Sequence, residues 1–131
     1  MTKAAALYQF FSSFGIPAYE ENTPIAMAEG GNAPTFPYLT YENKTGSFGD
    51  NNNVVISFTL WYRSFSQVAA NAKSQEIAAA IGRVGVKAYV DGGILIIRKP
   101  EGTWAENRGD DSDDTVIRID HSLILNYYTA N

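Results

Sequence analysis

The chain has 131 residues, of which 45% are hydrophobic and 13% aromatic, a composition typical of one packed domain over residues 1–131. Cysteine is absent, which excludes a disulfide framework, a thiolate metal site and a cysteine nucleophile. The net charge of −4 argues against sequence-specific binding of duplex DNA as the main activity, because such domains usually carry a basic surface. No apolar run is long enough to span a membrane, and we expect synthesis in the cytoplasm.

The first element predicted in chain order is a helix. Thr2 can cap it, and its apolar residues follow the spacing of one helix face: Leu7, Phe10, Phe11 and Phe14. Gly15 ends the helix, and Ile16-Pro17 turns the chain extended. The glycines and prolines between Ala18 and Pro37 predict a long irregular connection. A short strand is then expected over Tyr38–Asn43.

The segment from Asn53 to Phe65 predicts a central strand. Its alternating apolar residues place one face against a core: Val54, Ile56, Phe58, Leu60 and Tyr62. The other face mixes Val55 and Trp61 with polar residues, so we expect it to be covered only in part and to be a candidate for contact with another chain. The turn-rich segment Lys44–Asn52 should form the tip of a hairpin with the preceding strand.

A second helix is predicted over Gln67–Arg83, capped by Ser64 or Ser66. Its expected buried stripe is rich in alanine: Val68, Ala72, Ile77, Ala80, Ile81 and Val84. The strands VKAYV at 86–90 and ILIIRK at 94–99 flank Asp91-Gly92-Gly93, which indicates a hairpin.

The segment Glu101–Asp114 is polar and acidic and predicts a loop that is mobile in the free protein. A long final strand follows over Thr115–Tyr128, in which apolar residues and His121 alternate with polar ones. The order of these elements predicts an α+β fold: a mainly antiparallel twisted sheet of about five strands, with two helices packed on one face.

No catalytic constellation is apparent. His121 is the one histidine and lies on the apolar side of the last strand, which favours a core position over acid–base catalysis. No nucleophile elbow and no glycine-rich phosphate loop occurs. We therefore expect no catalytic residue and no cofactor.

The densest charge cluster is acidic and consists of Asp110, Asp111, Asp113 and Asp114. Carboxylates of this kind can bind a hard cation such as calcium, but the spacing does not fit an EF-hand loop, so no metal site is predicted. The cluster is either a solvated turn or an acidic loop that faces a lumen or a docking partner.

Several aromatic side chains are not readily assigned to the core and are candidates for an interface, because aromatic residues are enriched there. Packing on the second face of the sheet is the alternative. Val55, on the partly covered face of the central strand, is added to this set. The candidates are therefore Tyr38, Tyr41, Val55, Trp61, Trp104, Tyr127 and Tyr128.

Short patterns occur in a characteristic order: IPAY at 16–19, PYLTYE at 37–42, LWYRSFS at 60–66, DGGILIIRK at 91–99 and DDSDDTVIRI at 110–119. This layout resembles the tail terminator and head-tail joining proteins of long-tailed bacteriophages and prophages. The resemblance implies a virion assembly protein rather than an enzyme. It implies a ring, commonly a hexamer, that caps the tail tube, stops its polymerisation and presents the joining face for the head.

The partners implied by this resemblance are further copies of the chain, the tail tube protein and a head-completion or neck protein. DNA would pass through the ring without sequence-specific binding, and no membrane is involved. The protein would move from the host cytoplasm into the virion, at the junction of tail and head. A neck or head-completion protein is the related alternative, and a small α+β enzyme or ligand-binding domain is the alternative of a different class.

Overall fold

A computed structural model of the chain describes residues 1–21, 34–44, 46, 53–110 and 113–129. The fold is α+β, as predicted, and its elements are α1 (Lys3–Ser12), β1 (Ala18–Glu20), β2 (Tyr38–Tyr41), β3 (Val54–Arg63), α3 (Val68–Ile81), β4 (Val86–Val90), β5 (Gly93–Arg98), β6 (Ala105–Asp110) and β7 (Asp113–Thr129). The strands form one mostly antiparallel sheet in the order β1-β2-β3-β7-β5-β4, with β6 also paired to β7.

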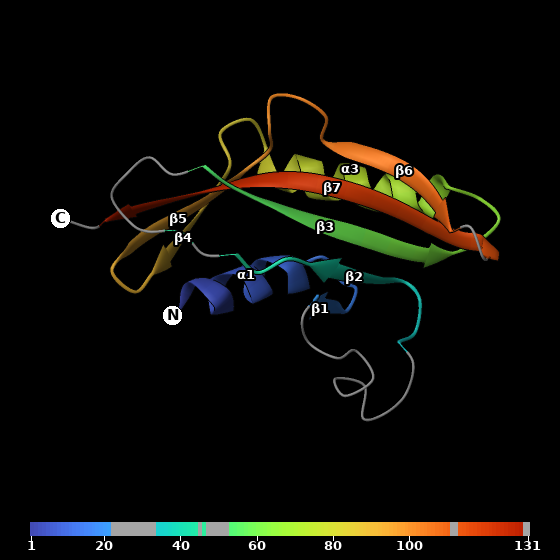
Figure 1. Ribbon diagram of the computed structural model, residues 1–131, viewed down its shortest axis with the longest axis horizontal. Helices are drawn as coiled ribbons and strands as arrows, with labels where there is room; N and C mark the ends of the chain where they lie inside the picture. Colours follow the sequence, from blue (N-terminus) through green and yellow to red (C-terminus); the bar gives the residue numbers. More distant parts are fainter. Residues whose placement is uncertain (22–33, 45, 47–52, 111–112, 130–131) are drawn as a thin grey trace.

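The long strands β3 and β7 form the middle of the sheet (Figure 1). They pair antiparallel along all ten residues of β3, from Val54 opposite Leu125 to Arg63 opposite Val116. The other edge of β7 is shared: β6 pairs with its first half and β5 with its second half. The central position predicted for Asn53–Phe65 is confirmed, as is the antiparallel pairing of this segment with β2.

Two strands are additional to the predicted set of about five. β1 lies at the start of the segment that was expected to be irregular, and it pairs parallel with β2. β6 lies within Glu101–Asp114, so the prediction of a loop over that whole segment is wrong. Its sequence AENRGD has no apolar alternation, and the strand is held by backbone pairing to β7. The segment Lys44–Asn52 falls mostly outside the described residues.

Both helices pack against the same face of the sheet, as predicted. From α1, the ring of Phe11 stacks on Tyr41 with 4.5 Å between centroids and lies 5.2 Å from the ring of Phe58. From α3, the Ser74 hydroxyl meets His121, which is the register partner of Phe58. Thr2 caps α1 by accepting from the Ala5 amide, whereas α3 begins with Ser66 Oγ accepting from the Val68 amide.

The core lies between the helices and this face, and its largest fully buried side chains include Tyr127, Phe11, Phe58, Leu60 and Ile119. The turn between β4 and β5 is the predicted one, and Gly92 in it has φ of 84°, a conformation that glycine adopts without strain. In the described part of the chain, neither helix covers the opposite face of the sheet. That uncovered face carries the side chains considered next.

Candidate functional site

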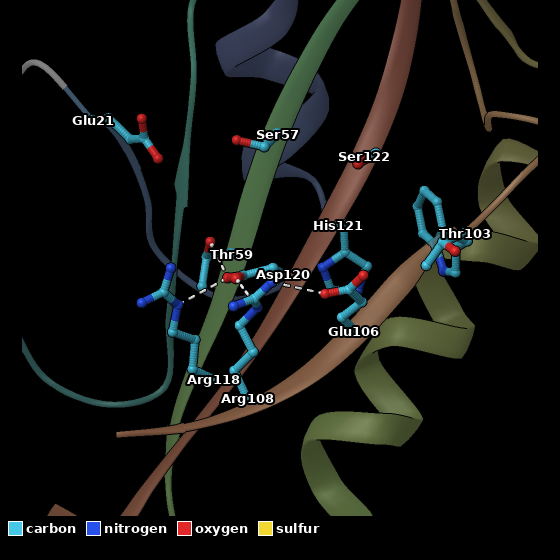
Figure 2. A pocket seen from close by; sticks show the side chains of 11 residues that line it. Glu21, Ser57, Thr59, Thr103, Glu106, Arg108, Arg118, Asp120, His121 and Ser122 are labelled. Atoms are coloured by element: carbon cyan, nitrogen blue, oxygen red, sulfur yellow. Dashed lines mark hydrogen bonds and ion pairs between the residues drawn. The ribbon is translucent and has the colours of Figure 1, made fainter. Parts of the chain in front are cut away.

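The uncovered face of the sheet is polar around Asp120, in the first half of β7 (Figure 2). The Asp120 carboxylate accepts a hydrogen bond from Thr59 Oγ1 at 2.9 Å and from Arg118 Nε at 2.9 Å. Its second oxygen lies 3.0 Å from Arg108 Nε, and Arg108 also pairs with Glu106 at 2.9 Å. This network joins β3, β6 and β7 across the sheet.

A hollow of about 300 Å³ lies beside Asp120, and its lining is mostly polar: Glu21, Ser57, Thr59, Thr103, Trp104, Glu106, Arg108, Arg118, Asp120, His121 and Ser122. The Asp120 carboxylate already has three partners, so its lone pairs are largely occupied. To accept a proton from a bound molecule, this carboxylate would first have to give up one of these contacts. Asp120 is therefore a poor candidate for an acid–base group.

Two glutamates beside the hollow differ in their pKa. Burial raises the pKa of Glu42, but hydrogen bonds from Ser57 at 2.7 and 2.8 Å and the charge of Lys44 outweigh it, and the net pKa is lowered. Burial, followed by repulsion from Glu42, raises the pKa of Glu21. Glu42 is thus held in place as an acceptor of hydrogen bonds from Ser57. The surroundings of Glu21, in contrast, disfavour its charged form.

The aromatic part of this face is built on Trp61. Its indole stacks on Tyr38 with 6.0 Å between ring centroids, and its Nε1 donates to Thr40 Oγ1 at 3.0 Å. The Arg118 guanidinium lies 5.3 Å from the Trp61 ring centroid, within the range of a cation–π interaction. Trp61 and Tyr38 are therefore positioned by contacts within the chain.

His121 is in the core, as expected from the alternation of β7, and is only 2% exposed. Its ring stacks on Phe58 with 4.2 Å between centroids, and its Nε2 is 2.8 Å from Ser74 Oγ. Burial lowers the pKa of His121 to about 4, against the opposing effects of the Phe58 and Ile119 backbone and of Asp120. The imidazole is neutral at pH 7, and its contacts with Phe58 and Ser74 hold the ring in the core.

The structure divides the interface candidates into two groups. Tyr41 and Tyr127 are core residues, and burial raises the pKa of each phenol to about 12. Tyr38 is also buried, against Trp61, and Trp104 packs edge-on against His121 with 5.1 Å between centroids.

Val55 and Tyr128 form the second group. They remain exposed on the uncovered face, at 56% and 39% respectively. The remaining five candidates are buried or only partly exposed, so these two are the members of the predicted set best placed to contact a partner.

Three members of the acidic cluster lie where β6 ends and β7 begins, and the backbone of Asp110 pairs there with that of Asp113. Asp111 lies outside the described residues, and for 110, 113 and 114 only the backbone is described. Among the side chains that the structure describes, no group of three or more His, Asp or Glu residues is arranged to hold a metal ion.

Sequence reasoning missed the Asp120 network, because its members are spread over three strands and β6 was not predicted. It also missed Tyr89, which is 72% exposed on β4. The signal for Tyr89 was present: in VKAYV, residues 87 and 89 alternate with the small or branched residues that face the core. No helix in the described part of the chain is long and apolar enough to cross a membrane.

Comparison with known proteins shows the fold but no family. No family model and no curated protein matches the chain. One solved structure, of a protein whose name describes no function, matches with a TM-score of 0.63 over 98% of this chain and 94% of its own. The two sequences are 16% identical, so this similarity establishes the α+β architecture over nearly the whole chain and nothing beyond it.

Proposed function

We propose that this chain is a ring-forming tail terminator of a long-tailed bacteriophage or prophage. In this role it caps the tail tube, stops tube polymerisation and provides the face to which the head joins. Its partners are further copies of itself, in a ring that is most simply a hexamer, together with the tail tube protein and a head-completion or neck protein. It acts in the host cytoplasm during assembly and then in the virion, and it is not an enzyme.

The observation that carries the proposal is the sheet face left uncovered by α1 and α3. Val55 and Tyr89 are largely exposed on it, and large apolar side chains on an open sheet face are typical of a surface that binds another protein. The order of short sequence patterns supplies the family resemblance. A neck or head-completion protein has the same requirements and differs only in its neighbours, so it remains the related alternative.

An enzyme or small-ligand protein is the alternative of a different class, and the polar hollow beside Asp120 is the feature that would favour it. Against it, Asp120 is held by Thr59, Arg108 and Arg118, and the His121 ring is stacked in the core. Neither group is placed to move a proton to or from a bound molecule. The assembly role accounts for the exposed apolar residues as well, and it is preferred for that reason.

The test is the control of tube length. Purified tail tube protein from the same phage or prophage is polymerised with and without this chain, and tube lengths are measured by electron microscopy. A terminator shortens the length distribution as its concentration rises and is seen as a ring at one tube end. Tubes of unchanged length without an added ring would contradict the proposal, and an effect on isolated heads instead of tubes would favour the neck protein.

A further inference from the structure

One end of the uncovered face carries an apolar patch made by four adjacent strands. Tyr89 of β4 pairs with Ile94 of β5, which in turn pairs with Tyr128 of β7. Register partners in a sheet point to the same face, so their side chains lie in one row. The next row along the strands contains Ile96, and the row after it contains Ile124 and Val55. The apolar residues of these three rows are here called the apolar sheet patch: Val55, Tyr89, Ile94, Ile96, Ile124 and Tyr128.

The rim of the apolar sheet patch is basic. Lys87 lies two residues before Tyr89 on β4, so it points to the same face, and it is exposed. Within the part of the chain that the structure describes, no carboxylate pairs with Lys87. Arg98, at the opposite side of the patch, donates to Asn126 Oδ1 at 2.8 Å and to Asn53 Oδ1 at 3.0 Å. Both acceptors are neutral amide oxygens, so neither of these contacts neutralises the positive charge of Arg98.

A second surface has the complementary chemistry. A groove of about 440 Å³ runs between α1 and β1, and its walls include Ala5, Tyr8, Tyr19 and Glu20. Tyr8 is exposed, and Glu20 supplies the negative charge at the rim of the groove. Among the described residues, no lysine or arginine forms an ion pair with Glu20. This surface, here called the acidic groove, is apolar in its walls and negative at its rim.

We infer that the apolar sheet patch of one copy binds the acidic groove of a second copy, with the Tyr89 ring inside the groove and Lys87 facing Glu20. Charge complementarity selects the partner: the basic rim of the patch meets the acidic rim of the groove, whereas patch against patch would place like charges together. The two surfaces are different, so the contact is head-to-tail, the type that closes into rings. The inference names the contact between neighbouring copies in the proposed ring, and it rests on the proposed function for the closure of that ring.

Cysteine cross-linking tests the contact directly, because the chain has no cysteine of its own. Full-length chains carrying Tyr8→Cys and Tyr89→Cys are mixed under mild oxidation. The expected result is a disulfide between the two variants in the mixture and none in either variant alone. A disulfide in the Tyr89→Cys chain alone would instead show a two-fold contact between patches and would overturn the inference.

A matched control uses Phe65→Cys, outside both surfaces. Phe65 lies just after β3 and is 91% exposed, more than any other large hydrophobic residue that the structure describes. Mixed with Tyr8→Cys, it should cross-link no faster than two chains that meet by chance. Equal rates for the Phe65 and Tyr89 variants would overturn the inference, because they would show random collision.

Charge reversal tests the pairing of Lys87 with Glu20 in solution. Lys87→Glu and Glu20→Lys should each weaken self-association about tenfold in sedimentation equilibrium, and the double variant should recover most of that loss. Both residues are surface side chains, and circular dichroism checks that each variant is folded. Single effects that merely add in the double variant would overturn the contact.

The outcomes separate this inference from the proposed function. Cross-linking in a closed dimer that does not shorten tail tubes would keep the contact and remove the terminator role. Rings that cap tubes without the Tyr8–Tyr89 cross-link would keep the role and remove the contact.

Discussion

Ser74 of α3 and His121 of β7 are hydrogen-bonded in the core, with 2.8 Å between Oγ and Nε2. The contact ties the second helix to the longest strand, 47 residues away in sequence. The imidazole is neutral at pH 7, because burial lowers its pKa to about 4. His121 is therefore both a packing residue and a source of sensitivity to acid.

Acidification should destabilise the fold between pH 6.5 and 4. In this window the unfolded state, with an ordinary histidine pKa of about 6.5, binds a proton that the folded state does not, so stability falls as pH falls. The expected loss is about 2 kcal/mol between pH 7.5 and 5, measured by urea unfolding. His121→Phe should flatten this dependence, and an unchanged slope in that variant would show that another group is responsible.

Ser74→Ala should cost about 1–3 kcal/mol, because it removes the one partner of a buried imidazole nitrogen and leaves that nitrogen without a hydrogen bond. Gln75→Ala, at the next and exposed position of the same helix, is the matched control and should change stability by less than about 0.5 kcal/mol. The measurement is the midpoint of urea unfolding at pH 7. Equal effects of the two substitutions would show that the Ser74 contact adds nothing to stability.

The elements with a strict two-residue period were predictable from sequence, and those held by tertiary contacts were not. β3, the β4–β5 hairpin and β7 are long enough for alternation to identify them. β6 has no such signal, because both faces of AENRGD are largely polar and its position depends on the edge of β7. β1 has three residues, too few to show a period.

The orientation of α3 illustrates the same point. Of the predicted stripe, Ile77 and Ile81 are buried as expected, whereas Val68 and Val84 are 75% and 88% exposed. The other two buried positions of the helix, Ala70 and Ser74, were not predicted. The predicted stripe contained apolar residues only, but the helix is rotated so that Ser74 meets His121. A serine on the buried face carries no hydrophobic signal, so this part of the arrangement was not readable from sequence.

Gly85→Ala should destabilise the fold by about 2 kcal/mol or more. Its φ is 90°, which strains any residue with a side chain, and an added Cβ would lie 2.6 Å from the Ile97 carbonyl oxygen of the neighbouring strand. Gly102→Ala is the control, since a Cβ there meets nothing within 4 Å. Thermal unfolding of both variants checks the prediction, which fails if the two melt together.

Asp120→Asn should cost about 1 kcal/mol, with a larger loss at low salt. The substitution leaves the guanidinium groups of Arg108 and Arg118 near one another without the carboxylate between them, and salt screens their repulsion. Urea unfolding at 50 mM and 500 mM NaCl measures the effect. Glu76→Gln, which removes an exposed pair with Lys73 on α3, is the control and should be nearly neutral at both. A loss in the Asp120 variant that does not depend on salt would assign its role to hydrogen bonding.

The acidic cluster is tested by replacing its four aspartates with asparagine: Asp110, Asp111, Asp113 and Asp114. This variant asks whether the negative charge of the cluster has a role in the proposed ring. A ring repeats these charges around its axis, and their field extends about 8–10 Å at physiological salt, which is enough to influence a narrow channel. A negative collar of this kind keeps DNA from adhering, or it docks a basic partner.

The quadruple variant should fold with nearly unchanged stability, because charges that have no buried partner contribute little to it. It should assemble into rings and terminate tubes, but DNA passage or the joining of heads to tails should be impaired. Complementation of a prophage that lacks the gene, with counts of joined particles and of infectious particles, separates these two defects. Normal yields of infectious particles would assign the cluster to a solvated turn with no role in assembly.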